Sequence, residues 1–284
     1  MRDFSIITDS CSDLPEELAN RYDIHLVSMH ILMDGDEIPM PEISEFYQQL
    51  RQGHVASTAA VSLGEFEDAM REILQSGKDV LYLSFSSALS TTYQSACIAA
   101  EDVLADFPEG RVEVVDTLAA NMQQGLLAVD CAIMRENGKS LTEVLDWVQQ
   151  EKLHRSAWFT VDELDYLKRG GRISPATAAV GTMLNIKPLM HVDHEGELIS
   201  VSKVRGRKSA LTAMVNEMEK NVTALEQQSI WVCHGDCQKD AEALAEQVKS
   251  RFGLQEVHIG RVGPVIGSHT GPSILALFFA GKER

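Results

Sequence analysis

Short apolar runs rich in β-branched residues alternate with helical patterns along the whole chain. Such runs predict strands, and apolar residues at three- and four-residue spacing predict amphipathic helices. In the first half, strands are predicted over 4–7, 24–29, 80–83 and 112–116, and helices over 43–51, after Ser62, from about Tyr93, and up to about Lys152. This alternation is typical of an α/β fold with a mostly parallel sheet and flanking helices.

The pattern changes at 151–156, where a charged and polar stretch predicts a domain boundary. We therefore expect an N-terminal α/β domain over 1–155 and a C-terminal mixed-sheet α/β domain over 156–284. In the second half, we expect strands over 158–161, 230–232, 257–259 and 274–279, a helix over 164–168, and a hairpin over 189–204. Gly196 supplies the positive backbone dihedral that the turn of such a hairpin favours.

Polar loops follow several strands of the first domain, and ligands of open parallel sheets bind beyond the carboxyl ends of the strands. The loops 8–13, 84–92 and 116–117 each follow a strand, and Ser57 and Thr58 precede the helix that Ser62 caps. The sequence therefore predicts hydroxyl groups gathered at one edge of this domain.

Ser90 and Thr58 each have a structural interpretation and a functional one. Ser90 could cap the helix that begins near Tyr93. A hydroxyl can accept from a helix N–H and still donate to an anion, which the helix N-terminus favours. Thr58 is not needed as a cap, because Ser62 caps the next helix. Its hydroxyl is either that of an ordinary surface threonine, which is common, or one that meets a ligand.

Basic residues and a glycine-rich segment stand out in the second domain. The segment 168–174 (KRGGRIS) places three cations around two glycines, so Arg172 could turn inward, and 203–208 holds a second cationic cluster. A solvated face is the usual role of such clusters, although guanidinium groups suit carboxylate or phosphate. We interpret 263–272 (GPVIGSHTGP) as a loop whose glycines bring the backbone close to another group. A lone histidine such as His269 is usually structural, but in a glycine-framed loop it could meet a ligand.

Composition narrows the function classes. The 284 residues include 42 acidic and 25 basic ones, and the net charge of −17 argues against nucleic acid as a partner. The sequence shows neither a signal-peptide pattern nor an apolar run long enough to span a membrane. Five scattered cysteines are most simply thiols in the reducing cytoplasm. The segments 191–194 and 233–237 lack paired metal-ligand spacing, so we interpret both as turns and expect no metal or cofactor.

Several motifs together carry a resemblance to a known family. They are ITDSCSDLP (7–15), SSALSTTYQSA (86–96), DELDYLKRGGRIS (162–174), LNIKP (184–188), KVRG (203–206) and the closing IGSHTGP (266–272). In this order they resemble the DegV family of fatty-acid-binding proteins, which includes the binding subunits of bacterial fatty acid kinase. The resemblance covers essentially the whole chain.

The resemblance implies two α/β domains that bury a long-chain, palmitate-like fatty acid, with no catalytic residue. The threonine and the serine that hold the carboxylate in the family fall on Thr58 and Ser90. The histidine near the carboxylate falls on His269, and the arginine thought to serve the acyl phosphate falls on Arg172. The implied role is lipid transport or presentation of the fatty acid to a kinase subunit, without stable membrane insertion.

The chain departs from the family pattern around these anchors. The middle of the threonine motif reads Ala59-Ala60-Val61, the glycine after Ser90 is Thr91, and Asn121 and Gln123 replace a serine and a glycine. The anchoring side chains remain, so the departures concern the shape of the pocket and the preferred acyl chain.

Two other functions compete with lipid binding. A serine hydrolase could use Ser90, His269 and either Asp9 or Asp116, but Ser90 lacks the glycines of a nucleophile elbow. A sugar-phosphate or nucleotide binder is also compatible with an α/β fold. The sequence contains neither a P-loop nor a GxGxxG motif that would support it.

Overall fold

A computed structural model describes residues 2–174 and 185–284, and the chain divides into two compact units. Unit 1 comprises residues 1–30 and 59–152, and unit 2 comprises 31–58 and 153–284. The C-terminal part of unit 2 begins close to the expected boundary, whereas 31–58 had been assigned to the first domain. The domain division at 155/156 stays a prediction. The first residue of the LNIKP motif, Leu184, lies outside the described residues.

Unit 1 is built on a four-stranded sheet that is parallel, as the sequence predicts, and its strand order is β2-β1-β6-β7. The strands are β1 (Phe4–Asp9), β2 (Ile24–Val27), β6 (Asp79–Ser84) and β7 (Val112–Asp116). β1 and β6 occupy the middle of the sheet, and every residue of both is buried. Because all four strands run in the same direction, the loops after their carboxyl ends meet at one edge of the sheet.

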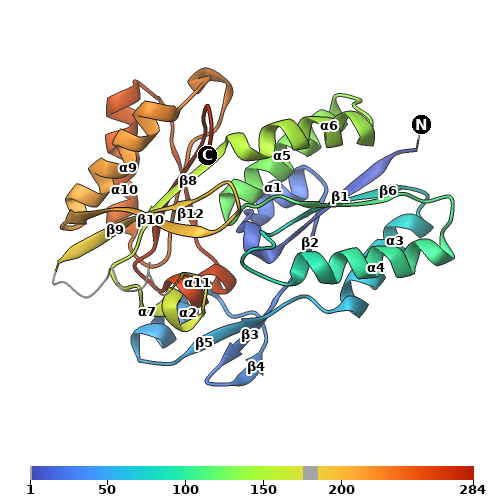
Figure 1. Cartoon of the computed structure of the whole chain (residues 1–284), viewed down its shortest axis with the longest axis horizontal. Helices are drawn as coiled ribbons and strands as arrows, with labels where there is room; N and C mark the ends of the chain where they lie inside the picture. Colours follow the sequence, from blue (N-terminus) through green and yellow to red (C-terminus); the bar gives the residue numbers. More distant parts are fainter. Residues whose placement is uncertain (1, 175–184) are drawn as a thin grey trace. The chain divides into compact units, whose positions relative to one another are not determined.

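Helices cover both faces of this sheet. α3 (Leu63–Gln75) packs beside α4 (Thr92–Asp106) on one face, and α5 (Met122–Glu136) lies on the other (Figure 1). The predicted cap of α3 is confirmed, because Ser62 and Glu65 form a complete capping box. Unit 1 also contains η1 (Ser10–Ser12), α1 (Glu16–Arg21) and α6 (Leu141–Glu151), and η2 (Lys152–His154) spans the point where the chain passes into unit 2.

The helical region predicted to run up to about Lys152 is two helices. Gly138 separates α5 from α6 with φ of 79°, a conformation that glycine adopts without the steric cost that side chains bring. Ser140 then begins α6 with a second capping box, in which Glu143 is the partner.

Unit 2 is built on a mixed six-stranded sheet in the order β10-β9-β8-β13-β11-β12. Among the strand pairs that the described residues form in this sheet, β11 and β12 are parallel and the other neighbours are antiparallel. The predicted hairpin over 189–204 is confirmed as β9 and β10, and Gly196 in its turn has φ of 78°. The strands are β8 (Arg155–Thr160), β9 (Ile186–Val192), β10 (Leu198–Arg205), β11 (Trp231–His234), β12 (His258–Arg261) and β13 (Leu275–Ala280).

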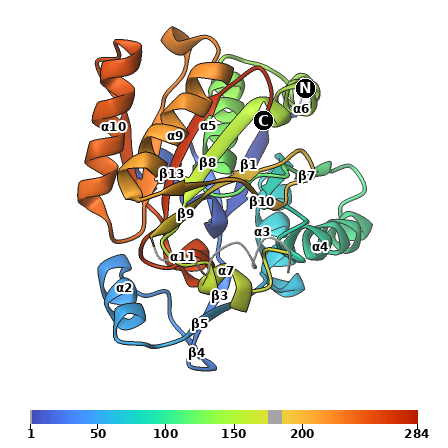
Figure 2. The same ribbon diagram turned by 60° about the vertical axis from the view of Figure 1, so that its left-hand side comes forward.

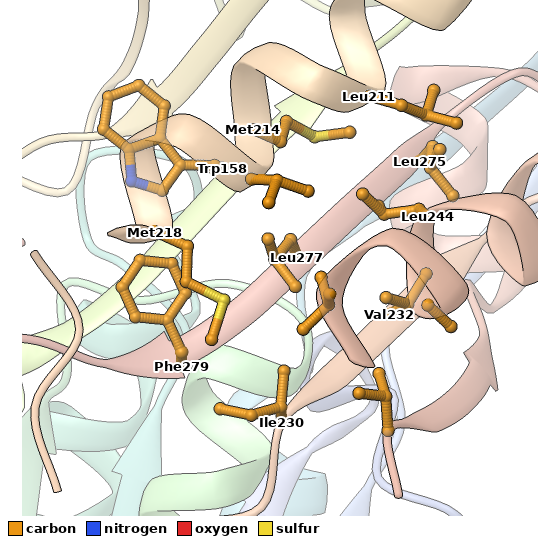
Figure 3. Packing of buried hydrophobic residues seen from close by; sticks show 14 of the residues in the cluster. Trp158, Leu211, Met214, Met218, Ile230, Val232, Leu244, Leu275, Leu277 and Phe279 are labelled. Carbon is orange, nitrogen blue, oxygen red and sulfur yellow. The ribbon is translucent and has the colours of Figure 1, made fainter. Parts of the chain in front are cut away.

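The core of unit 2 lies between this sheet and two helices that contact each other, α9 (Arg207–Asn221) and α10 (Gln238–Phe252). Leu275, Leu277 and Phe279 alternate along β13, so one face of the strand enters the core. Figure 3 shows Leu277 among side chains that include Met218 of α9, Leu244 of α10 and Val232 of the neighbouring strand β11. Unit 2 also contains η4 (Leu225–Gln227).

Three further helices and a small sheet belong to unit 2. α2 (Ile43–Arg51), α7 (Asp165–Arg169) and α11 (Pro264–Thr270) lie together, with α11 in contact with both α2 and α7 (Figure 2). The small sheet has the order β4-β3-β5, from β3 (His30–Met33), β4 (Asp36–Ile38) and β5 (Ala56–Ala59). Within residues 2–174 and 185–284, no helix combines the length and apolar character that crossing a membrane requires.

Two predictions about this region were wrong. The strand predicted over 24–29 ends at Val27, and the chain then enters β3 of a different sheet. Ser57 and Thr58, predicted as a loop of the first domain, lie on β5 of unit 2. A four-residue edge strand carries too few alternating positions to be recognised from its sequence.

Truncation of Leu277 tests this account of the core. Leu277→Ala leaves a cavity among fully buried neighbours, and we expect it to lower the free energy of unfolding by about 2–5 kcal/mol. Val201→Ala is a control, because Val201 is 48% exposed and should change stability by about 0.5 kcal/mol or less. Urea unfolding followed by circular dichroism measures both. Equal losses in the two variants would contradict this description of the core.

Candidate functional site

Two of the four residues singled out by the sequence meet directly in unit 2. The Thr58 hydroxyl lies 2.8 Å from Nε2 of His269, a hydrogen bond between residues 211 positions apart. Thr58 reaches this place because β5 alternates: Ala56 and Thr58 face inward, while Ser57 and Ala59 are exposed. The period-2 pattern of the strand therefore selects Thr58, and not its neighbour Ser57, for this contact.

His269 lies in the last turn of helix α11, which corrects the prediction of a loop over 263–272. Pro264 is the first residue of the helix, where its missing N–H costs nothing. Gly271 ends the helix with φ of 75° and is followed by Pro272, which cannot continue it. Glycine and proline are thus concentrated at the ends of a short helix that presents a histidine from a fixed backbone position.

The imidazole of His269 is neutral at pH 7. Its pKa is lowered to about 4, first because the ring is buried and then because the cations of Arg172 and Arg169 disfavour a second positive charge. A neutral imidazole has one N–H donor and one acceptor nitrogen. Its Nε2 can therefore either donate to or accept from the Thr58 hydroxyl, and the choice sets where the hydroxyl hydrogen points.

Arg172 lies close enough to His269 to affect its protonation. Its guanidinium donates a hydrogen bond to the Gly170 carbonyl, so the side chain folds back over the turn that follows α7. Arg169, at the end of α7, stacks over the ring of Tyr166 with 5.0 Å between guanidinium carbon and ring centre. The sequence singled out Arg172 but missed the role of Arg169, whose only signal was the density of cations in this segment.

Ser90 belongs to unit 1 and precedes α4. Its hydroxyl accepts from the Thr92 backbone N–H at 3.2 Å and shares a hydrogen with the Thr92 hydroxyl at 2.8 Å. The predicted N-cap at Ser90 is wrong, because Thr91 is the N-cap of α4 and makes no side-chain cap bond, although Ser90 still accepts from the first residue of the helix. When Thr92 donates in this pair, the Ser90 hydrogen is left for an acceptor beside the helix N-terminus.

Most other polar groups at this edge of unit 1 bond to one another. Asp9 is fully buried, and its carboxylate accepts from the Tyr82 hydroxyl at 2.7 Å, the Phe85 N–H at 2.9 Å and the Gln124 amide at 3.1 Å. Burial raises the pKa of Asp9, and these hydrogen bonds oppose the rise. Thr8 donates to the Leu83 carbonyl in the same network.

These bonds bear on the hydrolase alternative, which requires a carboxylate to orient His269. Asp9 is surrounded by donors of its own unit. Asp116 accepts from the backbone N–H groups of Ser87 and Leu118, at 3.2 and 3.0 Å. Both carboxylates therefore organise loops of unit 1.

The second cationic cluster is partly structural. Arg207 pairs with Asp240 at 2.8 Å and donates to the Ser273 carbonyl at 2.8 Å. Asp162, at the start of the DELDYLKRGGRIS motif, lies 2.7 Å from Lys187 and 3.6 Å from Arg207. These ion pairs fix the segment that leads into α7, whereas Lys203 and Arg205 are exposed on β10.

The two segments that contain possible metal ligands have other roles. His191 lies on β9, stacks on Trp158 with ring centres 4.4 Å apart, and has its pKa lowered to about 4 by burial. Asp193 shapes the hairpin turn by accepting from the N–H groups of Glu195 and Glu197. His234 ends β11, and the chain turns there before α10.

Comparisons with known proteins agree with this architecture. The model of a family described as "Uncharacterised protein, DegV family" matches residues 3–282. A DegV domain-containing protein of Clostridium perfringens is 42% identical over 289 residues, which span 100% of this chain and 99% of the relative. It is one of several DegV domain-containing proteins that match over nearly the full length.

Solved structures with similar folds include two proteins described by their ligands. A DegV family protein from Thermus thermophilus, described for its fatty acid binding, has 31% identity and a TM-score of 0.87, covering 99% of this chain and 100% of that one. A DegV lipid binding protein from Thermotoga maritima has 29% identity and a TM-score of 0.86, covering 99% of each chain.

The lowered pKa of His269 predicts how stability depends on pH. The unfolded chain takes up a proton near pH 6.5, whereas the folded ring resists protonation until about pH 4, so stability falls as pH drops through this window. His269→Gln removes the contribution of His269 to the pH dependence of the free energy of unfolding, which is at most about 2 kcal/mol between pH 7 and 5. The variant should therefore lose less stability than the wild type over this range. Urea midpoints at both pH values test it. Val201→Ala should keep the wild-type dependence, and a His269→Gln curve that also keeps it would contradict the prediction.

Proposed function

The chain belongs to the DegV family, and from this premise we propose that it binds one long-chain fatty acid in a buried pocket. The hydroxyls of Thr58 and Ser90 hold the carboxylate, with His269 beside it. Relatives of 29–31% identity and nearly the same fold are described as lipid or fatty acid binders, which supports the ligand class. Ser90 is assigned through the family motif, and Thr58 also through its contact with His269.

The hydrogen bond between Thr58 and a neutral His269 carries the proposal. If Nε2 donates to the hydroxyl oxygen, the single hydroxyl hydrogen of Thr58 points toward an acceptor such as a carboxylate. A carboxylate cannot be buried without compensation, and Arg172 and Arg169 supply positive potential near the ring. The Thr58 hydroxyl therefore orients the carboxylate, and Arg172 and Arg169 balance its negative charge without forming a direct ion pair with it.

The acyl chain supplies the driving force for binding. About fifteen methylenes of a palmitate-like chain contribute roughly 12 kcal/mol at about 0.8 kcal/mol each. Association costs of about 4–15 kcal/mol offset much of this gain. Affinity therefore depends on how well the chain fits, while the hydroxyls determine which end of the lipid is held.

We further propose that the protein is a ligand-binding subunit that presents the fatty acid carboxylate to a kinase. Asp9 and Asp116 are occupied by donors of unit 1, which favours holding a ligand over hydrolysing one. Arg172 would stabilise the acyl phosphate, because a guanidinium pairs well with phosphate oxygens. Its hydrogen bond to the Gly170 carbonyl is a local contact that such a product could replace.

Mass spectrometry tests the ligand class directly. The purified protein, held under native conditions, should carry an added mass equal to one fatty acid, and organic extraction should release that acid. After delipidation, shortening the chain by two methylenes should weaken binding by about tenfold. A protein that takes up no fatty acid after delipidation, while remaining folded, would overturn the proposal.

Substitutions at the two hydroxyls test the carboxylate anchor. Thr58→Ala and Ser90→Ala each remove a hydrogen bond to a charged group, worth about 1.5–3 kcal/mol, so each should weaken fatty acid binding by about 10–100-fold. Displacement of a fluorescent fatty acid measures the affinities. Thr58→Ser keeps the hydroxyl and should bind nearly as well as the wild type. Wild-type affinity in both alanine variants would show that the anchor lies elsewhere.

A further inference from the structure

Helices α7 and α11 interlock through two contacts. In each contact, a glycine at the end of one helix packs against an aromatic or imidazole ring of the other helix. A Cβ atom at Gly170, which follows α7, would lie 2.3 Å from Nδ1 of His269 on α11. A Cβ atom at Gly271, which follows α11, would lie 2.5 Å from the ring of Tyr166 on α7. Carbon atoms in contact normally stay about 3.5–4 Å apart, so neither position has room for a side chain.

The backbone distinguishes the two glycines. Gly271 has φ of 75°, a conformation that favours glycine whatever surrounds it. Gly170 has φ of −71° and ψ of −12°, which any residue adopts readily. The requirement for glycine at position 170 therefore comes from the imidazole of His269 and not from the chain conformation.

A third glycine fixes the other side of α11. A Cβ atom at Gly267 would lie 2.6 Å from the hydroxyl oxygen of Tyr47 on α2, and that hydroxyl donates to the Val262 carbonyl at 2.9 Å. α11 is thus confined between α2 and α7. The His269 ring has Gly170 at its Nδ1 side and the Thr58 hydroxyl at Nε2, so little freedom of rotation remains.

The charged groups near the ring come from the same segment as Gly170. Arg172 donates to the Gly170 carbonyl, and Arg169 stacks on Tyr166, the ring that rests on Gly271. A movement of α7 away from α11 would therefore shift the glycine, the aromatic ring and both cations together.

We propose that Gly170 and Tyr166 are positioning residues that hold the His269 imidazole in the orientation that bonds Thr58. The interlock sets the direction of the ring and the distance of the cations from it. Its relevance to lipid binding rests on the proposed function, in which Thr58 and His269 face the carboxylate. Gly170 and Tyr166 act through His269 and need not touch the ligand.

Gly170→Ala tests the interlock in the delipidated protein. The new methyl group should displace the ring from Thr58 toward water, so the pKa of His269, measured by NMR titration of the labelled imidazole, should rise from about 4 by at least 1 unit. Fatty acid affinity should fall by about tenfold. Gly64→Ala is the matched control, because Gly64 lies in helix α3 with nothing within 4 Å of the added methyl group.

A double-mutant cycle isolates the steric contact. Gly170→Ala should lower the urea midpoint in the wild type but hardly at all in a His269→Ala background, where the methyl group fills the vacated space. If Gly170→Ala alone fails to fold, the double variant with His269→Ala should fold better than the single variant. Tyr166→Leu tests the contact between Tyr166 and Gly271 by the same NMR titration of His269. An unchanged imidazole pKa in the variants, or equal destabilisation in both backgrounds, overturns the interlock.

The failure of the proposed function has a different signature. A shifted pKa and a coupled stability loss, together with wild-type fatty acid affinity, would support the interlock and remove His269 from the binding site.

Discussion

The hydrogen bond between Thr58 and His269 joins an early strand to a late helix, and the candidate site of unit 2 depends on it. The two residues are 211 positions apart, so local sequence preference cannot bring them together. The contact needs β5 held in its small sheet and α11 held between two helices. The Tyr47 hydroxyl on the Val262 carbonyl and the Arg51–Asp236 ion pair, 2.7 Å long, tie the same early segment to the C-terminal part of the unit.

In unit 1 the main requirement is different: polar groups buried at the carboxyl edge of its parallel sheet need hydrogen-bond partners. Tyr82 on β6 and Gln124 on α5 both donate to the Asp9 carboxylate on β1, so the three elements are linked through Asp9. A network of this kind is stabilising only when its members stay together, since a buried polar group without a partner is costly. The ITDSCSDLP motif therefore has a structural function in addition to any contact with a ligand.

The sequence predicted best what depends on local pattern. The helix over 43–51 and the strand over 112–116 have the predicted bounds, because each has a clear period and clear end signals. α11 was missed because a helix of seven residues with three nearby glycines shows no recognisable period. The pairing of Thr58 with His269 was accessible only through the family motifs. The interlock of Gly170 and Tyr166 was not accessible, because the sequence showed the glycines but not the rings that face them.

The division of unit 2 into two stretches of chain has a consequence for its biosynthesis. The segment 31–58 leaves the ribosome before Asp236, Val262 and His269 are made. These residues bind its side chains across 185, 215 and 211 positions. Until then these three contacts are absent, because contacts between distant parts of the chain form only when both parts exist. The Thr58–His269 pair can therefore form only after the segment that carries His269 has been made.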